Sequence, residues 1–180
     1  DAESHFILAV THAQKKDLDT AMAHVTKALA AGMPVERFLA SPRGLLAPLV
    51  ESEAFRALAK AKASPLVHGP MVGSVTDTSA RFWVRTAEEA EVEVAVRPAV
   101  MGDVAKPVRV KGRTKAEDDY TAVLEATGLA PDTAYTCAVH VGGTKVDVPL
   151  SPFRTFPKAG GPARFKVVFG GGAGYTPKYE

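Results

Sequence analysis

The residues of this chain whose types and spacing could serve chemistry lie near its end, where residues 170–174 supply four glycines in five positions. A loop of this composition can adopt positive φ and bring its backbone close to a ligand or to another chain. An apolar run at residues 165–169 precedes the loop, and Thr176 with Pro177 follows it as a helix-start signal. No Gly-Lys-Ser/Thr follows, and the spacing does not fit G-x-G-x-x-G, so neither a Walker loop nor a dinucleotide fingerprint is indicated.

Helices and strands elsewhere in the chain must position this glycine loop. Two kinds of hydrophobic pattern divide the rest of the chain into segments. Residues 1–62 carry helix-period patterns with start and stop signals, whereas residues 66–157 carry strand-period patterns and turn residues. Residues 163–180 make a third segment, in which a run suited to burial on both faces predicts the first strand of a helix-covered sheet. We therefore expect an α+β multidomain chain: a helical hairpin or repeat-like segment, an antiparallel β-sandwich, and the first strand and glycine loop of an incomplete α/β domain.

Composition and charge are those of a soluble globular protein. Of the 180 residues, 46% are hydrophobic and 23% are charged, and the formal net charge is +2. Lys and Arg are spread along the chain, which does not favour nucleic acid or an anionic membrane as a partner. No apolar run approaches the roughly 18 residues of a membrane span. The single cysteine, Cys137, excludes an internal disulfide and a multi-cysteine zinc site.

Two helices joined by a short turn are predicted at the start of the helical segment. The apolar stripe of the first is expected to comprise Phe6, Ile7, Val10 and Ala13. The second is expected to begin at Asp17 or Asp19, to end at Gly32, and to bury Ala21, Val25, Ala28 and Leu29. The small residues of this second helix resemble those of a tetratricopeptide repeat, although His5 and His12 replace the bulky residues of its first helix. A solenoid needs about three such repeats.

Further helix starts are predicted at Ser41–Pro42 and near Ser52, the last helix burying Phe55, Leu58 and Ala59. The sandwich strands are expected in the strings VHGPMVGSVT, SARFWVRT, EVEVAVRP, PVRVKG, YTAVLEA, AYTCAVHV and SPFRTF. The string GLAPDTAYTCAVHV predicts a tyrosine corner at Tyr135, typical of Greek-key sandwiches of the fibronectin type III pattern. Counting by two from Tyr135 places Cys137 on the core face.

Residues 66–180 resemble the N-terminal part of the alkaline phosphatase D family. The resemblance rests on four strings in this order: LVHGPMVGSVTDTSARFWVRT, GLAPDTAYTCAVHVGG, SPFRTFP and ARFKVVFGGGAGY. The resemblance implies an exported metallophosphatase, in which a fibronectin-like domain precedes a larger catalytic domain. It also implies iron and calcium, or other divalent metals, for the full-length protein, an extracytoplasmic location, and the chain's own catalytic domain as partner.

The same resemblance makes Gly171, Gly172 and Gly174 candidates to line a phosphate pocket through backbone N–H groups at a helix start. The competing interpretation is a tight turn with close packing. Family members commonly place a metal-ligating cysteine near Gly171 or Gly172, and the Asp-x-His motif of other metallophosphoesterases does not occur at this strand end. No catalytic residue, metal ligand or cofactor site is therefore assigned within this chain.

Other reactive side chains favour structural roles. The histidines are scattered and form no ligand-like motif, and Ser74, Ser79 and Ser151 lack a nucleophile elbow. Trp83, between two arginines, is expected either to pack under them or to contact a neighbouring domain. The KGRTKAEDDY stretch predicts a solvated loop, with partner binding as the alternative.

The main functional hypothesis is that this chain is the N-terminal, non-catalytic portion of a metal-dependent phosphatase or phosphodiesterase that acts on phosphate esters. The alternative is a non-enzymatic protein- or carbohydrate-binding module, with the helical segment as a possible protein-binding part. A third possibility is a relative that keeps the fold but has lost its metal, because glycine stands where the ligating cysteine is expected.

Overall fold

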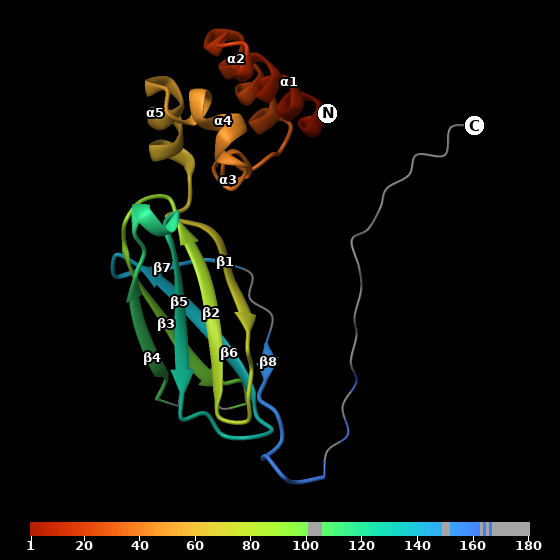
Figure 1. Ribbon diagram of the computed structural model, residues 1–180, viewed down its shortest axis with the longest axis vertical. Helices are drawn as coiled ribbons and strands as arrows, with labels where there is room; N and C mark the ends of the chain where they lie inside the picture. The colour runs from red at the N-terminus through yellow and green to blue at the C-terminus, as the bar shows by residue number, and fades with distance from the viewer. Residues whose placement is uncertain (101–105, 149–151, 163, 165, 167–180) are drawn as a thin grey trace, which may run out of the picture.

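The computed structural model describes residues 1–100, 106–148, 152–162, 164 and 166. Five helices come first and an antiparallel β-sandwich follows them (Figure 1). The predicted fold of a helical segment followed by a fibronectin-like sandwich is confirmed. The predicted strand at residues 165–169 and the glycine loop after it lie outside the described residues, apart from residue 166.

The helices are α1 (Ala2–Gln14), α2 (Leu18–Ala30), α3 (Glu36–Leu39), α4 (Arg43–Val50) and α5 (Glu53–Lys62). Asp17 and Ser52 accept hydrogen bonds from the backbone N–H of the third residue after each, and so cap α2 and α5 as expected. Gly32 follows α2 with a φ of 92°, the left-handed conformation that stops a helix. Ser41 does not cap α4, because its hydroxyl donates to the carbonyl of Arg37 at 2.6 Å.

The buried stripe of α1 differs from the predicted one. Phe6, Ala9 and Ala13 are buried, whereas Ile7 is 60% exposed. The helical period of 3.6 residues puts positions 6, 9 and 13 on one face, and the small side chains of Ala9 and Ala13 fit the close approach of α1 and α2. The predicted Ile7 contact is therefore wrong, and Ala9 takes its place.

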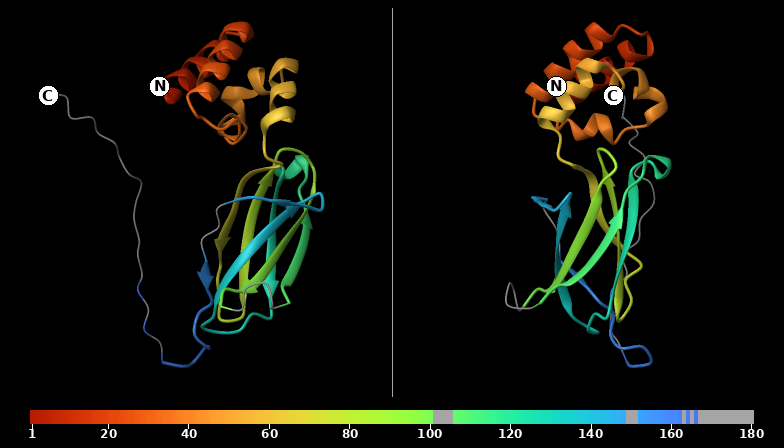
Figure 2. Two further views of the ribbon diagram at one scale, coloured as in Figure 1. Left: turned by 180° about the vertical axis from the view of Figure 1, so that it is seen from behind. Right: turned by 90° about the vertical axis from the view of Figure 1, so that its left-hand side faces the viewer.

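The sandwich contains β1 (Leu66–Gly73), β2 (Ser79–Thr86), β3 (Glu91–Pro98), β4 (Val108–Arg113), β5 (Thr121–Thr127), β6 (Ala134–Val141), β7 (Thr144–Val146) and β8 (Phe153–Arg154). One sheet has the order β1-β2-β5 and the other β4-β3-β6-β7, with β8 also paired to β6 (Figure 2). Only β7 was not predicted. It follows a turn at Gly142 and Gly143, whose φ values of 56° and 82° suit a tight hairpin.

Two separate hydrophobic cores hold the described chain. The sandwich core includes the alternating residues Val92, Val94 and Val96, as the period-2 pattern predicts. The helical core is a different cluster with no member in common. The tyrosine corner is confirmed, because the hydroxyl of Tyr135 accepts a hydrogen bond from the backbone N–H of Ala130 at 2.7 Å.

Candidate functional site

The glycines named as phosphate-pocket candidates, Gly171, Gly172 and Gly174, lie outside the residues that the structure describes, and so does Ser151. Their role stays a prediction. The structure instead shows where the other chemically capable side chains of the helical segment and the sandwich come together.

Three histidines that are far apart in sequence meet on one face of the α1–α2 hairpin. The Nδ1 atoms of His5 and His24 are 3.1 Å apart, and the rings of His12 and His24 stack with centroids 5.6 Å apart. Nδ1 of His12 lies 2.9 Å from Oδ2 of Asp17. The expectation of scattered histidines is therefore wrong for these three, and the seven-residue spacing of His5 and His12 was the signal that placed them on one helix face.

The pKa values of His24 and Asp17 are both lowered in this cluster. Burial lowers the pKa of His24, and the positive charges of Lys27, His5 and His12 lower it further. Hydrogen bonds from Thr20 and His12 lower the pKa of Asp17. Across the described ranges, no group of three or more His, Cys, Asp or Glu side chains has an arrangement suited to a metal ion. Hydrogen bonds join His5 to His24 and His12 to Asp17.

We expect the helical segment to lose thermal stability as the pH falls below about 6.5, the ordinary pKa of histidine. Because the pKa of His24 is lowered in the folded state, the unfolded chain binds a proton at this imidazole more readily than the folded chain does. The neutral imidazole therefore contributes its full stability above about pH 6.5, and this contribution declines as the pH falls below that value. Thermal melts followed by circular dichroism at 222 nm between about pH 8 and about pH 5 should show this decline. His24→Gln should flatten it and His68→Gln in the sandwich should not; equal pH dependence in His24→Gln and the parent would contradict the assignment.

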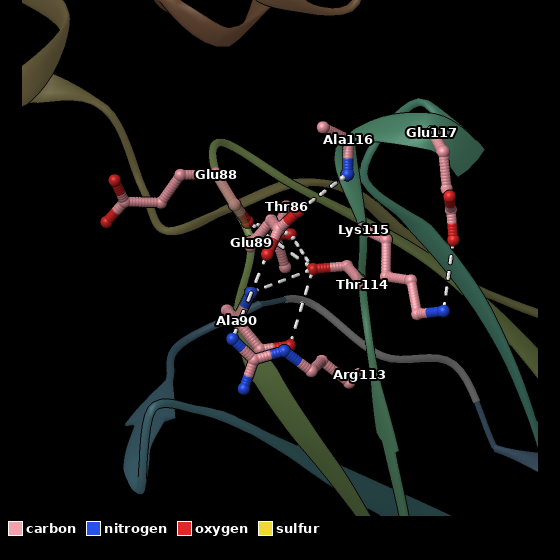
Figure 3. Close-up of polar contacts among 9 residues, drawn as sticks. All are labelled: Thr86, Glu88, Glu89, Ala90, Arg113, Thr114, Lys115, Ala116 and Glu117. Carbon is pink, nitrogen blue, oxygen red and sulfur yellow. Dashed lines mark hydrogen bonds and ion pairs between the residues drawn. The ribbon is translucent and has the colours of Figure 1, made fainter.

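The charged stretch KGRTKAEDDY pairs its charges within the protein (Figure 3). Nζ of Lys115 lies 3.0 Å from Oε1 of Glu117, and Nη2 of Arg113 lies 3.8 Å from Oε2 of Glu89. All four side chains are largely exposed to solvent. The stretch departs from the predicted solvated loop, because its first three residues end β4, Thr114 is buried, and Ala116–Asp118 form a short 3₁₀ helix.

Behind these ion pairs lies a buried pair of hydroxyl groups (Figure 3). The Oγ1 atoms of Thr86 and Thr114 are 2.6 Å apart, and these residues are 2% and 0% exposed. Thr114 accepts from the backbone N–H of Ala90 at 3.0 Å, and Thr86 donates to the carbonyl of Glu88 at 2.7 Å. Sequence reasoning missed this pair, because Thr86 at the end of β2 and Thr114 just after β4 carry no sign in the sequence that they meet.

Arg85 joins the sandwich to the helical segment. Its Nη2 lies 2.8 Å from Oδ2 of Asp119, and its Nη1 donates to the carbonyl of Ala40 at 3.4 Å. The side chain is only 10% exposed. A second link comes from Glu36, whose carboxylate accepts a hydrogen bond from the backbone N–H of Ser64. The start of β1 and the end of β2 are thus the end of the sandwich that meets the helices.

The opposite end of the sandwich holds the segment through which the chain leaves it (Figures 1 and 2). Thr155 is 1% exposed, and its hydroxyl donates to the carbonyl of Ala130 at 2.7 Å. The backbone N–H of Ala159 donates to Oδ2 of Asp77 at 3.1 Å. Asp77 belongs to the β1–β2 loop, which is the end of that hairpin far from the helices. The exit segment is therefore fixed against the far end.

Trp83 lies in an apolar row on the outer face of the β1-β2-β5 sheet. The strand register aligns Met71 with Trp83 and Trp83 with Val123. Met71 is 55% exposed and Val123 is 63% exposed. The indole makes an edge contact with the ring of His68, with centroids 5.4 Å apart.

A hollow of about 410 Å³ lies on the outer face of the other sheet. Its floor is the register pair Ala95 and Ala138 on β3 and β6. Its full lining is Ala95, Arg97, Arg109, Thr136, Cys137, Ala138, His140 and Lys145. No carboxylate contributes to this lining, and three of the eight residues are permanently cationic.

Glu93 lies beside the hollow and holds part of its wall in place. It forms an ion pair with Arg109, and Nζ of Lys111 lies 3.6 Å from its second oxygen. Burial acts to raise the pKa of Glu93, but the hydrogen bond and charge of Arg109 and the charge of Lys111 outweigh it, so the pKa is lowered. Nδ1 of His140 is 4.0 Å from Oε1 of Glu93, and it is buried without a hydrogen-bond partner among the described residues.

Cys137 is half-buried and packs against the sandwich core, as predicted. Burial raises the pKa of its thiol to about 11 from the ordinary value of 9.0. The thiol therefore stays protonated at neutral pH and is a poor nucleophile there.

None of the helices that the structure describes is long and apolar enough to cross a membrane.

Comparison with known structures returns fibronectin-like and other β-sandwich proteins. A structure of PhoD is 20% identical over 51% of this chain and 19% of that chain, with a TM-score of 0.44. The chain thus spans about a fifth of the length of the PhoD structure that it matches. A sensor domain of the anti-sigma factor RsgI4 of Pseudobacteroides cellulosolvens is 18% identical, covering 53% of this chain and 99% of that one, with a TM-score of 0.37. A computationally redesigned β-sandwich protein is 18% identical, with coverage of 53% and 97% and a TM-score of 0.41.

No curated protein matches the sequence. One family does, and it is described as "Domain of unknown function (DUF7800)". Its match covers residues 63–159, which is more than half of the chain and includes every strand of the sandwich. This chain therefore belongs to the DUF7800 family.

Proposed function

We propose that this chain is the N-terminal, non-catalytic part of a metal-dependent phosphatase of the alkaline phosphatase D type, whose catalytic domain follows the described residues. Support comes first from the order of the sequence motifs. The first string forms the β1–β2 hairpin, the second contains the tyrosine corner at Tyr135, and the third contains β8. The fourth string is the predicted first strand of the catalytic domain.

The observation that carries the proposal is the anchoring of the exit segment at the end of the sandwich opposite the helices. Thr155 and Ala159 are hydrogen-bonded to the body of the sandwich there, whereas Arg85 and Glu36 link the helices to the other end. A domain that begins soon after residue 160 would start from a fixed point. The sandwich would then act as a rigid spacer between the helical segment and the catalytic domain.

The proposed chemistry belongs to that following domain. In metal-dependent phosphatases, bound metal ions polarise the phosphoryl oxygen and generate hydroxide from water. Iron and calcium, or other divalent metals, are proposed for the full-length protein on the family resemblance, as is an extracytoplasmic location. The described residues would position that domain by holding the exit segment against the end of the sandwich.

We expect residues 1–180 alone to show no phosphatase activity, whereas the protein extended beyond residue 180 hydrolyses phosphate monoesters or diesters. The measurement is release of nitrophenol from p-nitrophenyl phosphate and bis-p-nitrophenyl phosphate, with and without a chelator. Activity of the extended protein should fall on metal removal and return when metal is added back. Activity of residues 1–180 that changes with point substitutions within them would contradict the proposal, as would an extended protein that binds metal tightly but hydrolyses neither ester.

A non-enzymatic interaction module is the second candidate, and an apolar groove on the helical segment favours it. The groove has a volume of about 240 Å³ and lies between α1 and α4. Ile7 and Leu45, on its walls, are 60% and 50% exposed. The coding sequence beyond residue 180 separates the two candidates, because a continuation without carboxylate and histidine motifs at strand ends favours the interaction module.

A further inference from the structure

We propose that the hollow on the outer face of β3 and β6 binds a small organic anion that carries carboxylate or phosphate groups. The proposal concerns the sandwich alone and does not depend on the phosphatase proposal. It combines the shape of the hollow, the charge of its wall and the polar side chains that line it.

The shape follows from the strand register. Ala95 and Ala138 stand opposite each other on neighbouring strands, so the two smallest side chains of this face are adjacent. One row along, Glu93 stands opposite His140, and on the other side Arg97 stands opposite Thr136. Arg97, Thr136 and His140 wall the alanine floor, and Glu93 lies beside the hollow. The volume of about 410 Å³ is within the range of about 300–1,000 Å³ of small-molecule sites, and is larger than a single inorganic ion requires.

The charge of the wall selects an anion. Arg97, Arg109 and Lys145 all line the hollow, and no acidic side chain does. Lys145 makes no ion pair with any residue that the structure describes. Arg109 is held by Glu93 at the edge, which orients its guanidinium before a ligand arrives. The planar guanidinium can donate two parallel hydrogen bonds to one carboxylate or phosphate group. A neutral sugar has no such charged pair of oxygens to accept both bonds.

His140 adds a polar side chain to the wall, and this side chain is 23% exposed. Its Nδ1 is buried 4.0 Å from Oε1 of Glu93, so the exposed part of the ring is the part open to a ligand. Together with the hydroxyl of Thr136, the imidazole adds polar contacts to the same wall. A ligand bearing several oxygens would use these groups and the cations at once.

The experiment is a titration of residues 1–180 followed by ¹H–¹⁵N correlation spectra, with citrate in one arm and glycerol 3-phosphate in the other, at constant ionic strength. We expect saturable shifts confined to the amides around Ala95, Thr136, Ala138 and Lys145. Saturation by citrate alone identifies carboxylate as the ligand group, and saturation by glycerol 3-phosphate alone identifies phosphate. Saturation by both identifies a general oxyanion site.

Two substitutions test the location. Ala138→Leu fills the floor without changing charge and should abolish the saturable shifts. Lys145→Gln, which keeps the proposal testable if Ala138→Leu does not fold, should weaken binding roughly tenfold. Ala61→Leu and Lys60→Gln on α5 are matched controls that should leave binding unchanged.

The proposal is overturned if neither probe saturates, or if sodium chloride at equal ionic strength produces the same shifts. Shifts spread over basic residues outside the hollow would overturn it as well. So would unchanged binding in a folded Ala138→Leu variant.

Discussion

Replacing Phe38 with alanine is expected to destabilise the helical segment by about 3–5 kcal/mol, the cost typical of removing a buried phenylalanine ring. Phe38 is 1% exposed and links the two ends of the helical core. Its ring centroid lies 5.0 Å from that of Phe6 on α1 and 6.0 Å from that of Phe55 on α5. The free energy of unfolding of so small a helical segment is expected to be only a few kcal/mol, close to the cost of this substitution. We therefore expect the helices of the variant to unfold near room temperature.

The sandwich should remain folded in this variant, because the two cores share no residue. The single tryptophan, Trp83, lies in β2, so its fluorescence reports on the sandwich alone, whereas circular dichroism at 222 nm reports mainly on the helices. We expect the helical transition to move to lower temperature and the fluorescence transition to stay in place.

Ile7→Ala is the matched control, since Ile7 lies on the same segment but is 60% exposed. It should change stability by less than about 0.5 kcal/mol. Equal shifts of both transitions in Phe38→Ala would show that helices and sandwich unfold as one unit, and would contradict the prediction.

Replacing Thr114 with valine is expected to destabilise the sandwich by about 2–3 kcal/mol, because it removes the acceptor of the Ala90 N–H and one of the hydrogen bonds of the buried Thr86 hydroxyl. Valine keeps the shape of threonine but removes the hydroxyl. The backbone N–H of Ala90 then loses its 3.0 Å acceptor, and Thr86 loses its 2.6 Å partner. Thr86 and Thr114 are 2% and 0% exposed, so water has little access to the groups that lose a hydrogen bond.

Denaturant unfolding followed by Trp83 fluorescence measures this cost. Thr127→Val, at the exposed end of β5, is the control and should change the free energy of unfolding little. The double variant Thr86→Val with Thr114→Val should cost less than the sum of the two single variants, because the second substitution removes a group that the first left unpaired. Strict additivity, or a cost of Thr114→Val below about 0.5 kcal/mol, would show that the hydroxyl pair is not a stabilising network.

Much of the fold was predictable because its signals are local. The alternation of Val92, Val94 and Val96 identifies a strand with one buried face. The other strands except β7 were predicted from strings of strand length separated by turn-forming residues. The tyrosine corner at Tyr135 was predictable for a similar reason, because the hydroxyl and its backbone partner at Ala130 are five residues apart. Caps such as Asp17 and Ser52 act within a single helical turn.

The candidate sites were far less predictable, because their residues meet across strands and helices. His5 and His24 touch only when α1 and α2 pack antiparallel, and Thr86 meets Thr114 only through the folding of the sandwich end. The hollow depends on the β3–β6 register, since a shift of one residue would place Ala138 on the other face of the sheet.

By itself, the sequence determined most of the succession of helices and strands, together with many of their caps and turns. Each of these depends on neighbours within a few positions of the chain. Only the tertiary structure decided which side chains lie together: the histidine cluster, the hydroxyl pair, the Arg85 link between helices and sandwich, and the cationic hollow over Ala95 and Ala138. These contacts join residues distant in sequence, so they depend on strand register and helix packing, which no local pattern contains.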